Sequence, residues 1–293
     1  MVKTNSLERD LESRTAISKD GTIVSFLSLG KGPGVIVVPR VLSMATDYSA
    51  FASALASNFN VHILERRGRG RSGPQGEGYN IQKEIDDVLA VQHETGASYL
   101  VGHSYGGLIA LEAARNNNVF SRIAAYEPGV SIDGSMPVYW MPGYKKKMAE
   151  NRNFDAFVEF ALADAPAHLA KLPAWLMKLL LRLHFVRYPE NKKMLGLLQQ
   201  NLHEWIEIAK LDNHYKDYHE ISAPVLLLYG GRSDSKAVDL VIERLPTVIP
   251  NCETKLFPKL DHFGIERTAP SLVAKEIGDF FKNSIMKRKS NNT

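Results

Sequence analysis

The feature that most constrains the fold is a repeated alternation of short β-rich runs with helical patterns. Runs rich in branched and aromatic residues lie at 23–29, 34–38, 61–64, 99–101, 123–126, 225–229 and 253–257. The clearest of the helical segments between them begins at Asn80, a typical N-cap residue, and ends near Gly96. Strands that alternate with helices form parallel crossover units. We therefore expect an α/β fold with a mostly parallel central sheet flanked by helices.

One segment interrupts this alternation. Between 131 and 215 there is no convincing strand pattern, whereas apolar residues such as Trp175, Leu179 and Leu183 recur at helical spacing. We interpret 131–215 as a helical cap (lid) inserted into an α/β core that comprises 1–130 and 216–293. Ligand sites of such sheets lie outside the carboxyl ends of the strands, and the cap is expected to cover that edge. The alternative is that the segment only extends the flanking helices.

Composition excludes several other classes of protein. The 293 residues are 44% hydrophobic and carry 36 Lys and Arg against 32 Asp and Glu, a net charge of +4. Disordered, collagen-like and coiled-coil chains do not have this composition. A charge of +4 is too dilute to indicate a nucleic-acid partner. A single cysteine, Cys252, cannot form an internal disulfide, which fits a reducing compartment.

The sequence gives no sign of membrane insertion. The N-terminus lacks the apolar core of a signal peptide. The most apolar helical window, 175–186, is interrupted by Lys178 and Arg182 and is too short to span a bilayer. We expect a cytoplasmic protein that acts on a small-molecule substrate, with no membrane and no nucleic-acid partner. No pattern indicates an oligomeric state.

The most informative motif is Gly102-His-Ser-Tyr-Gly106, which follows a predicted strand and precedes an apolar helix. A sharp strand-to-helix turn forces its central residue into a strained conformation, and glycines two positions away remove the resulting Cβ clashes. The hydroxyl of Ser104 would then stand at a helix N-terminus, where backbone N–H groups stabilise a developing oxyanion. We predict that Ser104 is a nucleophile. The alternative is a glycine-rich turn with an incidental serine.

A serine nucleophile needs a base that an acid orients. Asp234 follows the predicted strand at 225–229, and His262 follows the next strand. Both residues should therefore lie at the carboxyl edge of the sheet, beside Ser104, in the chain order serine, acid, histidine. Glu127 competes for the role of the acid because it directly follows the strand at 123–126. Asp261 adjoins His262 but should point elsewhere.

These motifs resemble the α/β-hydrolase fold superfamily over about residues 15–282. The resemblance includes the Arg-Gly-x-Gly-x-Ser stretch at 67–72, which is typical of the serine esterase and proline-iminopeptidase-like branch with a helical cap. It implies that Ser104 is the nucleophile, His262 the general base and then acid, and Asp234 the orienting carboxylate. It also implies that the backbone N–H of Tyr105 forms half of the oxyanion hole.

The chain departs from this family after the strand at 34–38. Relatives usually have His-Gly there, whereas this chain has Pro39-Arg40. By position, the N–H of Val41 is the expected second oxyanion donor, with Leu42 next. Arg40 would lie near the mouth of the site, either as a solvated cation or as a partner for a substrate carboxylate.

The expected activity is hydrolysis of a small carboxylic ester or related acyl compound through an acyl-enzyme on Ser104. Hydrolysis of C–C, amide or lactone bonds by the same residues and a non-catalytic small-molecule receptor are the alternatives. Leu42, beside Arg40, and Trp140 in the cap are further candidate substrate-binding residues, although aromatics such as Trp140 more often pack against the core. The histidines show no metal-ligand spacing, so neither a metal nor a cofactor is expected.

Overall fold

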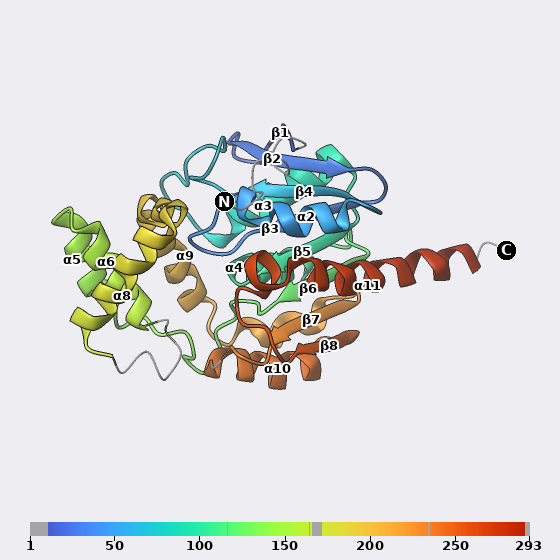
Figure 1. Ribbon diagram of the computed structural model, residues 1–293. Coiled ribbons are helices and arrows are strands. Elements are labelled where there is room, and N and C mark those ends of the chain that lie inside the picture. The colour runs from blue at the N-terminus through green and yellow to red at the C-terminus, as the bar shows by residue number, and fades with distance from the viewer. Residues whose placement is uncertain (1–10, 116, 164, 166–171, 234, 291–293) are drawn as a thin grey trace.

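The computed structural model describes residues 11–115, 117–163, 165, 172–233 and 235–290, with side chains up to 282. Its centre is an eight-stranded sheet with the strand order β1-β2-β4-β3-β5-β6-β7-β8 (Figure 1). The strands are β1 (Glu12–Ile17), β2 (Ile23–Gly30), β3 (Gly34–Val38), β4 (Asn60–Glu65), β5 (Tyr99–His103), β6 (Arg122–Tyr126), β7 (Val225–Gly230) and β8 (Cys252–Phe257). The pairs β1–β2 and β2–β4 are antiparallel, and all other pairs are parallel. The predicted α/β class is therefore confirmed.

Strand β1 was not predicted from the sequence. Of its six residues only Ala16 is buried, and Ile17 is 74% exposed. An edge strand without a continuous apolar face carries neither the alternating nor the uniform hydrophobic pattern by which the other strands are recognised. β1 is held by its register with β2.

Helices cover both faces of the sheet. On one face lie α2 (Ser49–Leu55) and α11 (Pro270–Ser290), which pack with Val35 and Val37 of β3. On the other face lie α3 (Ile81–Thr95), α4 (Tyr105–Arg115) and α10 (Lys236–Val248), which pack with Ile36 and Val38. Successive β3 residues thus enter opposite cores, as expected for a strand buried on both faces.

The limits predicted for the helix after Asn80 are those of α3. The Asn80 side chain accepts a hydrogen bond from Lys83 N at 3.2 Å, and Gly96 ends the helix with a φ of +66°. Asparagine at the N-cap satisfies a free amide of the first turn, and glycine adopts the left-handed conformation at low cost.

The chain between β6 and β7 forms the helical insertion, which lies at the opposite end of the molecule from the C-terminal end of α11 (Figure 1). Its elements are α5 (Met141–Ala149), α6 (Asn153–Ala163), α8 (Ala174–Arg187), the 3₁₀ segment η3 (Pro189–Gly196), α9 (Leu198–Lys210) and the 3₁₀ segment η4 (His214–Glu220). The described part of this insertion contains no strand, as its periodicity predicted. The domain limits 131 and 215 stay a prediction.

Aromatic side chains hold the cap helices together. Trp140, Phe160 and Trp205 meet edge to face, with ring centroids 5.1 to 5.6 Å apart. Such pairs stabilise a core beyond the area they bury. None of the helices in the described part of the chain is both long and apolar enough to cross a membrane.

Candidate active site

Ser104 lies on a sharp turn between β5 and α4. Its φ is +54°, a left-handed conformation that is rare for residues other than glycine. A Cβ atom on Gly106 would lie 2.0 Å from the carbonyl oxygen of Val38, and one on Gly102 would lie 2.3 Å from that of Gly106. Both glycines are therefore required for this close approach of backbone segments. The predicted strand–turn–helix context of Ser104 is present.

His262, in the loop after β8, contacts the carboxylate of Glu127. The distance from His262 Nδ1 to Glu127 Oε2 is 2.7 Å. Glu127 is buried, and its Oε1 accepts hydrogen bonds from the backbone N–H of Gly230 at 2.8 Å and from the hydroxyl of Ser233 at 2.5 Å. A carboxylate fixed by two further donors holds the imidazole in one orientation. Because Nδ1 faces this carboxylate, it carries the proton, which leaves Nε2 able to act as a base.

Backbone strain gathers at the same edge of the sheet. Leu42, Ser104 and Glu127 have φ values of +52°, +54° and +41°, and they follow β3, β5 and β6. The other non-glycine residues with positive φ among those described are Asp133, Asn151 and Asn213. Aspartate and asparagine tolerate this conformation, whereas leucine and glutamate do not, and such strain is concentrated at functional sites.

The predicted acid, Asp234, lies outside the described residues. Its rival Glu127 is the carboxylate that the structure places against His262. The available sequence signal was its position directly after a buried strand at the carboxyl edge. Asp261 points into its own turn, as predicted, since its Oδ1 accepts the backbone N–H of Phe263 at 3.0 Å.

A chain of hydrogen bonds connects the turn after β3 with His262. The N–H of Arg40 donates to the hydroxyl of Tyr48 (3.1 Å), which lies 2.7 Å from His103 Nδ1. His103 Nε2 lies 2.8 Å from the carbonyl oxygen of His262. The chain is consistent only if Nε2 of His103 carries the proton and Nδ1 accepts. Burial, reinforced by the nearby charges of His262 and Arg40, holds the pKa of His103 well below its ordinary value.

The two expected oxyanion donors lie at the ends of β3 and β5. Tyr105 is the first residue of α4, so no carbonyl of its own helix accepts its N–H. In the turn after β3, the N–H of Arg40 is occupied by Tyr48, and Val41 follows it. Val41 and Leu42 are both buried. Their role as donors stays a prediction.

Arg40 differs from both expectations derived from the sequence. Its side chain is buried, and its Nε and Nη2 donate to Glu266 at 2.8 to 3.1 Å, while Nη1 donates to the carbonyl oxygen of Val41 at 2.8 Å. Burial opposes its charge, but Glu266 overcomes this and raises the pKa of Arg40. It is neither a solvated cation nor a guanidinium left open for a substrate carboxylate, because Glu266 already occupies the bidentate position.

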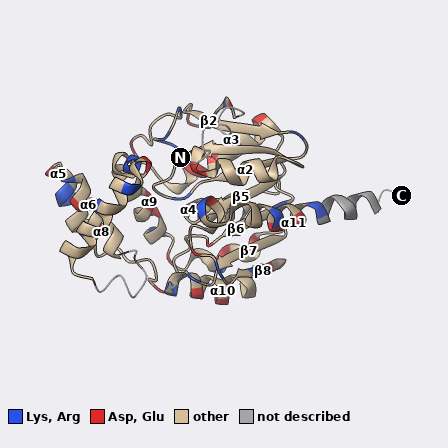
Figure 2. Cartoon of the chain, viewed as in Figure 1, with Lys and Arg blue, Asp and Glu red and all other residues tan. Residues whose placement is uncertain are grey.

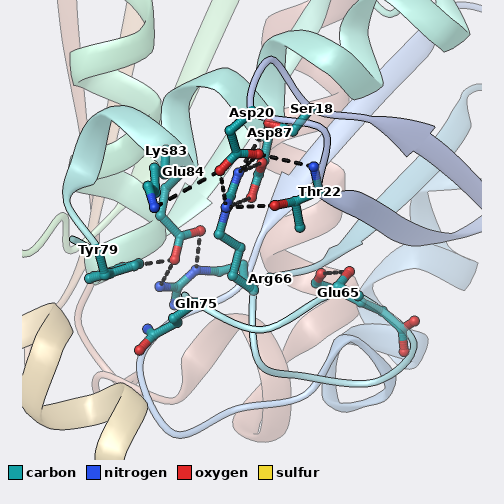
Figure 3. Close-up of polar contacts among 12 residues, drawn as sticks. Ser18, Asp20, Thr22, Glu65, Arg66, Gln75, Tyr79, Lys83, Glu84 and Asp87 are labelled. Atoms are coloured by element: carbon teal, nitrogen blue, oxygen red, sulfur yellow. Dashed lines mark hydrogen bonds and ion pairs between the residues drawn. The ribbon is translucent and has the colours of Figure 1, made fainter. Parts of the chain in front are cut away.

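A group of buried ion pairs, which we call the arginine network, contacts the turn after β3. It consists of Arg66, Arg67, Arg69, Glu84, Asp87 and Glu204, all 3% exposed or less. Arg66 lies 2.9 Å from both Glu84 and Glu204, and Arg69 lies 2.7 Å from Glu204. Burial alone would raise the pKa of Glu84, but Arg66 lowers it. Figure 3 shows Tyr79, Glu84 and Arg66 in a row, with Asp20 and Asp87 grouped beside them.

The arginine network joins three parts of the site. Glu204 belongs to cap helix α9, whereas Arg66 follows β4 in the core. Arg66 Nη1 also donates to the carbonyl oxygens of Pro39 (3.3 Å) and Arg40 (3.2 Å), and its guanidinium lies over the ring of Tyr105. Arg66 therefore connects the cap, the turn after β3 and the start of α4.

Trp140 lies in the cap, at the start of α5. It is 1% exposed, and its indole N–H donates to the carbonyl oxygen of Pro137 at 2.7 Å. It borders a cavity of about 380 Å³ between α5, α6 and α8. None of the described residues that line this cavity is Ser104, Glu127 or His262. Within the described part of the chain, no three His, Cys, Asp or Glu side chains form a group that could hold a metal ion.

The fold and this geometry agree with a family match. The model of the alpha/beta hydrolase family matches residues 40–276. The chain belongs to this family. The match includes the Ser104 turn, Glu127 and His262.

The chain is also similar to individual proteins. An alpha/beta hydrolase from Sphaerobacter thermophilus is similar, with a TM-score of 0.78, 26% identity, and coverage of 92% of this chain and 100% of that one. An esterase from Thermogutta terrifontis has a TM-score of 0.65 and 19% identity, covering 93% and 98% of the two chains, and shows the fold alone. N-formylmaleamate deformylase of Pseudomonas putida is 33% identical over 110 residues, which span 36% of this chain and 41% of the deformylase.

Proposed function

We propose that the protein is a serine hydrolase that cleaves a small carboxylic ester or related acyl compound through an acyl-enzyme on Ser104. The observation that carries this proposal is the meeting of three strand ends. Ser104 follows β5 in a strained turn, Glu127 follows β6, and His262 is bonded to Glu127 at 2.7 Å. Membership of the alpha/beta hydrolase family supports the same reading.

In this mechanism the hydroxyl oxygen of Ser104 attacks the acyl carbon while His262 Nε2 takes its proton. The backbone N–H groups of Tyr105 and Val41 stabilise the oxyanion of the tetrahedral intermediate. His262 then returns the proton to the departing alcohol or amine, which leaves the acyl group on Ser104. Water, deprotonated by His262, attacks this ester, and His262 then returns the proton to the departing oxygen of Ser104 as the acid is released.

We assign the role of the orienting acid to Glu127. Its carboxylate accepts a hydrogen bond from the Nδ1–H of His262 and stabilises the imidazolium that forms during each proton transfer. The two donors on its other oxygen, Gly230 and Ser233, keep it in this position. Asp234 remains the second candidate, on the chain order of the motif alone.

An amide is the second candidate substrate class. The observation that favours it is the partial match to N-formylmaleamate deformylase, a name that indicates removal of a formyl group from an amide nitrogen. The same triad and oxyanion donors serve both reactions, since both pass through a tetrahedral oxyanion. A non-catalytic receptor is the remaining alternative, and it would not need an activated serine.

Labelling with a fluorophosphonate tests this proposal directly. The wild-type chain should be labelled, and Ser104→Ala should not, because only an activated serine reacts with the probe. Turnover of p-nitrophenyl acetate and butyrate should fall by about 10³-fold or more in Ser104→Ala. Comparing these esters with an N-formyl amide then separates the two substrate classes. An unlabelled wild-type chain, or ester turnover unchanged in Ser104→Ala, would overturn the proposal.

A further inference from the structure

Cap helix α8 exposes a row of large apolar side chains. Trp175, Leu183 and Val186 are 68%, 58% and 78% exposed, and Leu179 and Leu180 are 47% and 43% exposed. No other helix in the described chain exposes as many large apolar residues. Single exposed apolar residues are ordinary, but a contiguous patch marks a surface that another body covers.

The exposed row lies on the side of α8 away from Met177 and Phe185, and Trp175 at its edge also borders the cavity between α5, α6 and α8. Met177 and Phe185 are buried, and the ring of Phe185 meets those of Phe154 and Phe157 at 5.8 and 5.5 Å. At about 100° per residue, positions 175, 179, 183 and 186 fall within an arc of about 80° on the other side. A helix that is apolar on both faces is normally buried on both. The described residues cover only one of them.

The charges on α8 are all positive. The helix carries Lys178, Arg182 and Arg187 but no Asp or Glu. Lys178 is paired with Asp155 of α6 at 2.5 Å, whereas Arg182 and Arg187 lie on either side of the apolar row. The insertion as predicted, 131–215, has eleven Lys and Arg against nine Asp and Glu, a small positive excess. Figure 2 shows α8 as mostly uncharged, with Lys and Arg on the neighbouring cap helices.

We propose that the outer face of α8 docks on the surface of an anionic phospholipid bilayer. The apolar row would enter the interface, and Arg182 and Arg187 at its margins would meet the anionic headgroups. Trp175 at the start of the helix and Tyr188 directly after its end are the residue types that favour this depth. The helix has 14 residues, too short to span a bilayer, so it would lie in the plane of the surface.

Charge favours this occupant over a second copy of the chain. A symmetric dimer through α8 would bring the same face of both copies together. The cations of one copy would then lie against those of the other, with no carboxylate on either helix to compensate. An anionic lipid surface satisfies the apolar and the positively charged groups at once. Docking of α8 on a lipid surface would differ from the expectation, drawn from the sequence, that the protein has no membrane partner.

Tryptophan fluorescence provides the test. The chain has three tryptophans, and Trp140 and Trp205 are only 1% and 2% exposed, so Trp175 dominates any response to a change of solvent. Vesicles of phosphatidylcholine with phosphatidylglycerol should shift the emission to the blue, protect it from iodide and carry the protein upward in a flotation gradient. Vesicles of phosphatidylcholine alone should have none of these three effects, and salt should reverse the effects of the anionic vesicles because it screens the headgroup charges.

Two substitutions separate α8 from a general effect of exposed apolar residues. Val186→Asp should reduce the vesicle-bound fraction about tenfold, because a carboxylate enters the apolar row and repels the headgroups. Ile17→Asp is the matched control, since Ile17 on β1 is 74% exposed, nearly as much as Val186. The control should leave binding to anionic vesicles unchanged.

Three outcomes would overturn the proposal. They are no flotation with anionic vesicles, equal loss of binding in both variants, and a concentration-dependent dimer that Val186→Asp abolishes while vesicles have no effect. Fluorophosphonate labelling of the same preparation keeps this result separate from the proposed activity. A chain that is labelled but does not bind vesicles contradicts only the docking of α8.

Discussion

The arginine network and the outer face of α8 are both exceptions to the rule that charged residues are exposed and apolar residues are buried. The network buries arginines that are ordinarily exposed, and α8 exposes leucine, valine and tryptophan that are ordinarily buried. Each guanidinium of the network meets a carboxylate within the chain, as Arg66 meets Glu84 and Arg69 meets Glu204. The exposed apolar row has no such partner among the described residues. The buried charges are therefore compensated within the fold, whereas the exposed apolar row of α8 requires a partner outside it.

The largest expected effect is that of replacing Glu127, the buried carboxylate that contacts His262. Glu127→Gln keeps the shape of the side chain but removes the carboxylate that orients His262, so kcat for a p-nitrophenyl ester should fall about 10⁴-fold with KM little changed. Steady-state kinetics measure this, with circular dichroism to verify folding. Asp234→Asn is the companion variant. A larger loss in that variant than in Glu127→Gln would return the role of the acid to Asp234.

The next prediction tests whether the ion pairs of the arginine network contribute more to the free energy of unfolding because they are buried. Arg66→Met leaves Glu84 buried without its guanidinium, and the free energy of unfolding should fall by about 3–5 kcal/mol. Urea unfolding measures this. The control is Arg14→Met, because Arg14 and Glu94 form an exposed pair at a similar distance of 3.0 Å, and its loss should cost about 0–1 kcal/mol. Similar losses in both variants would remove the distinction between buried and exposed pairs.

A smaller effect follows from His103, the buried neutral histidine beside His262. Below a pH of about 6.5, the unfolded chain protonates His103 but the folded chain does not, so stability should fall as the pH is lowered towards 5. This side chain alone contributes a slope of about 1.4 kcal/mol per pH unit, which His103→Gln should remove. Tyr48→Phe should instead cost about 1 kcal/mol at every pH. An unchanged slope in His103→Gln would mean that His103 is protonated in the folded state.

The smallest expected effect concerns α8. Val186→Ser on its outer face should change the free energy of unfolding by less than about 0.5 kcal/mol, because the folded chain does not cover that face. Phe185→Ala on its inner face should cost about 3–5 kcal/mol. Thermal unfolding of both variants measures the difference. A large destabilisation by Val186→Ser would mean that another part of the chain packs on the outer face.

Local patterns predicted the parts of the molecule that local physics determines. The parallel strands, the helix from Asn80 and the turn at Ser104 follow from periodicity, capping and the spacing of glycines. The sequence did not predict the partners of buried charges, because Arg69 and Glu204 are 135 positions apart and no periodicity relates them. Periodicity also cannot tell a covered apolar stripe from an uncovered one, so the exposure of α8 required the three-dimensional arrangement.

The contact of Glu204 with Arg66 and Arg69 has a consequence for how this cap can be exchanged. Replacing α9 with a helix from another hydrolase would leave Arg66 and Arg69 without the carboxylate of Glu204 that they share, even if the new helix packed well. The new helix would have to supply a carboxylate at the same place, or the core would have to lose an arginine with it. Cap and core are therefore matched by charge as well as by shape, and their evolution should be coupled at these positions.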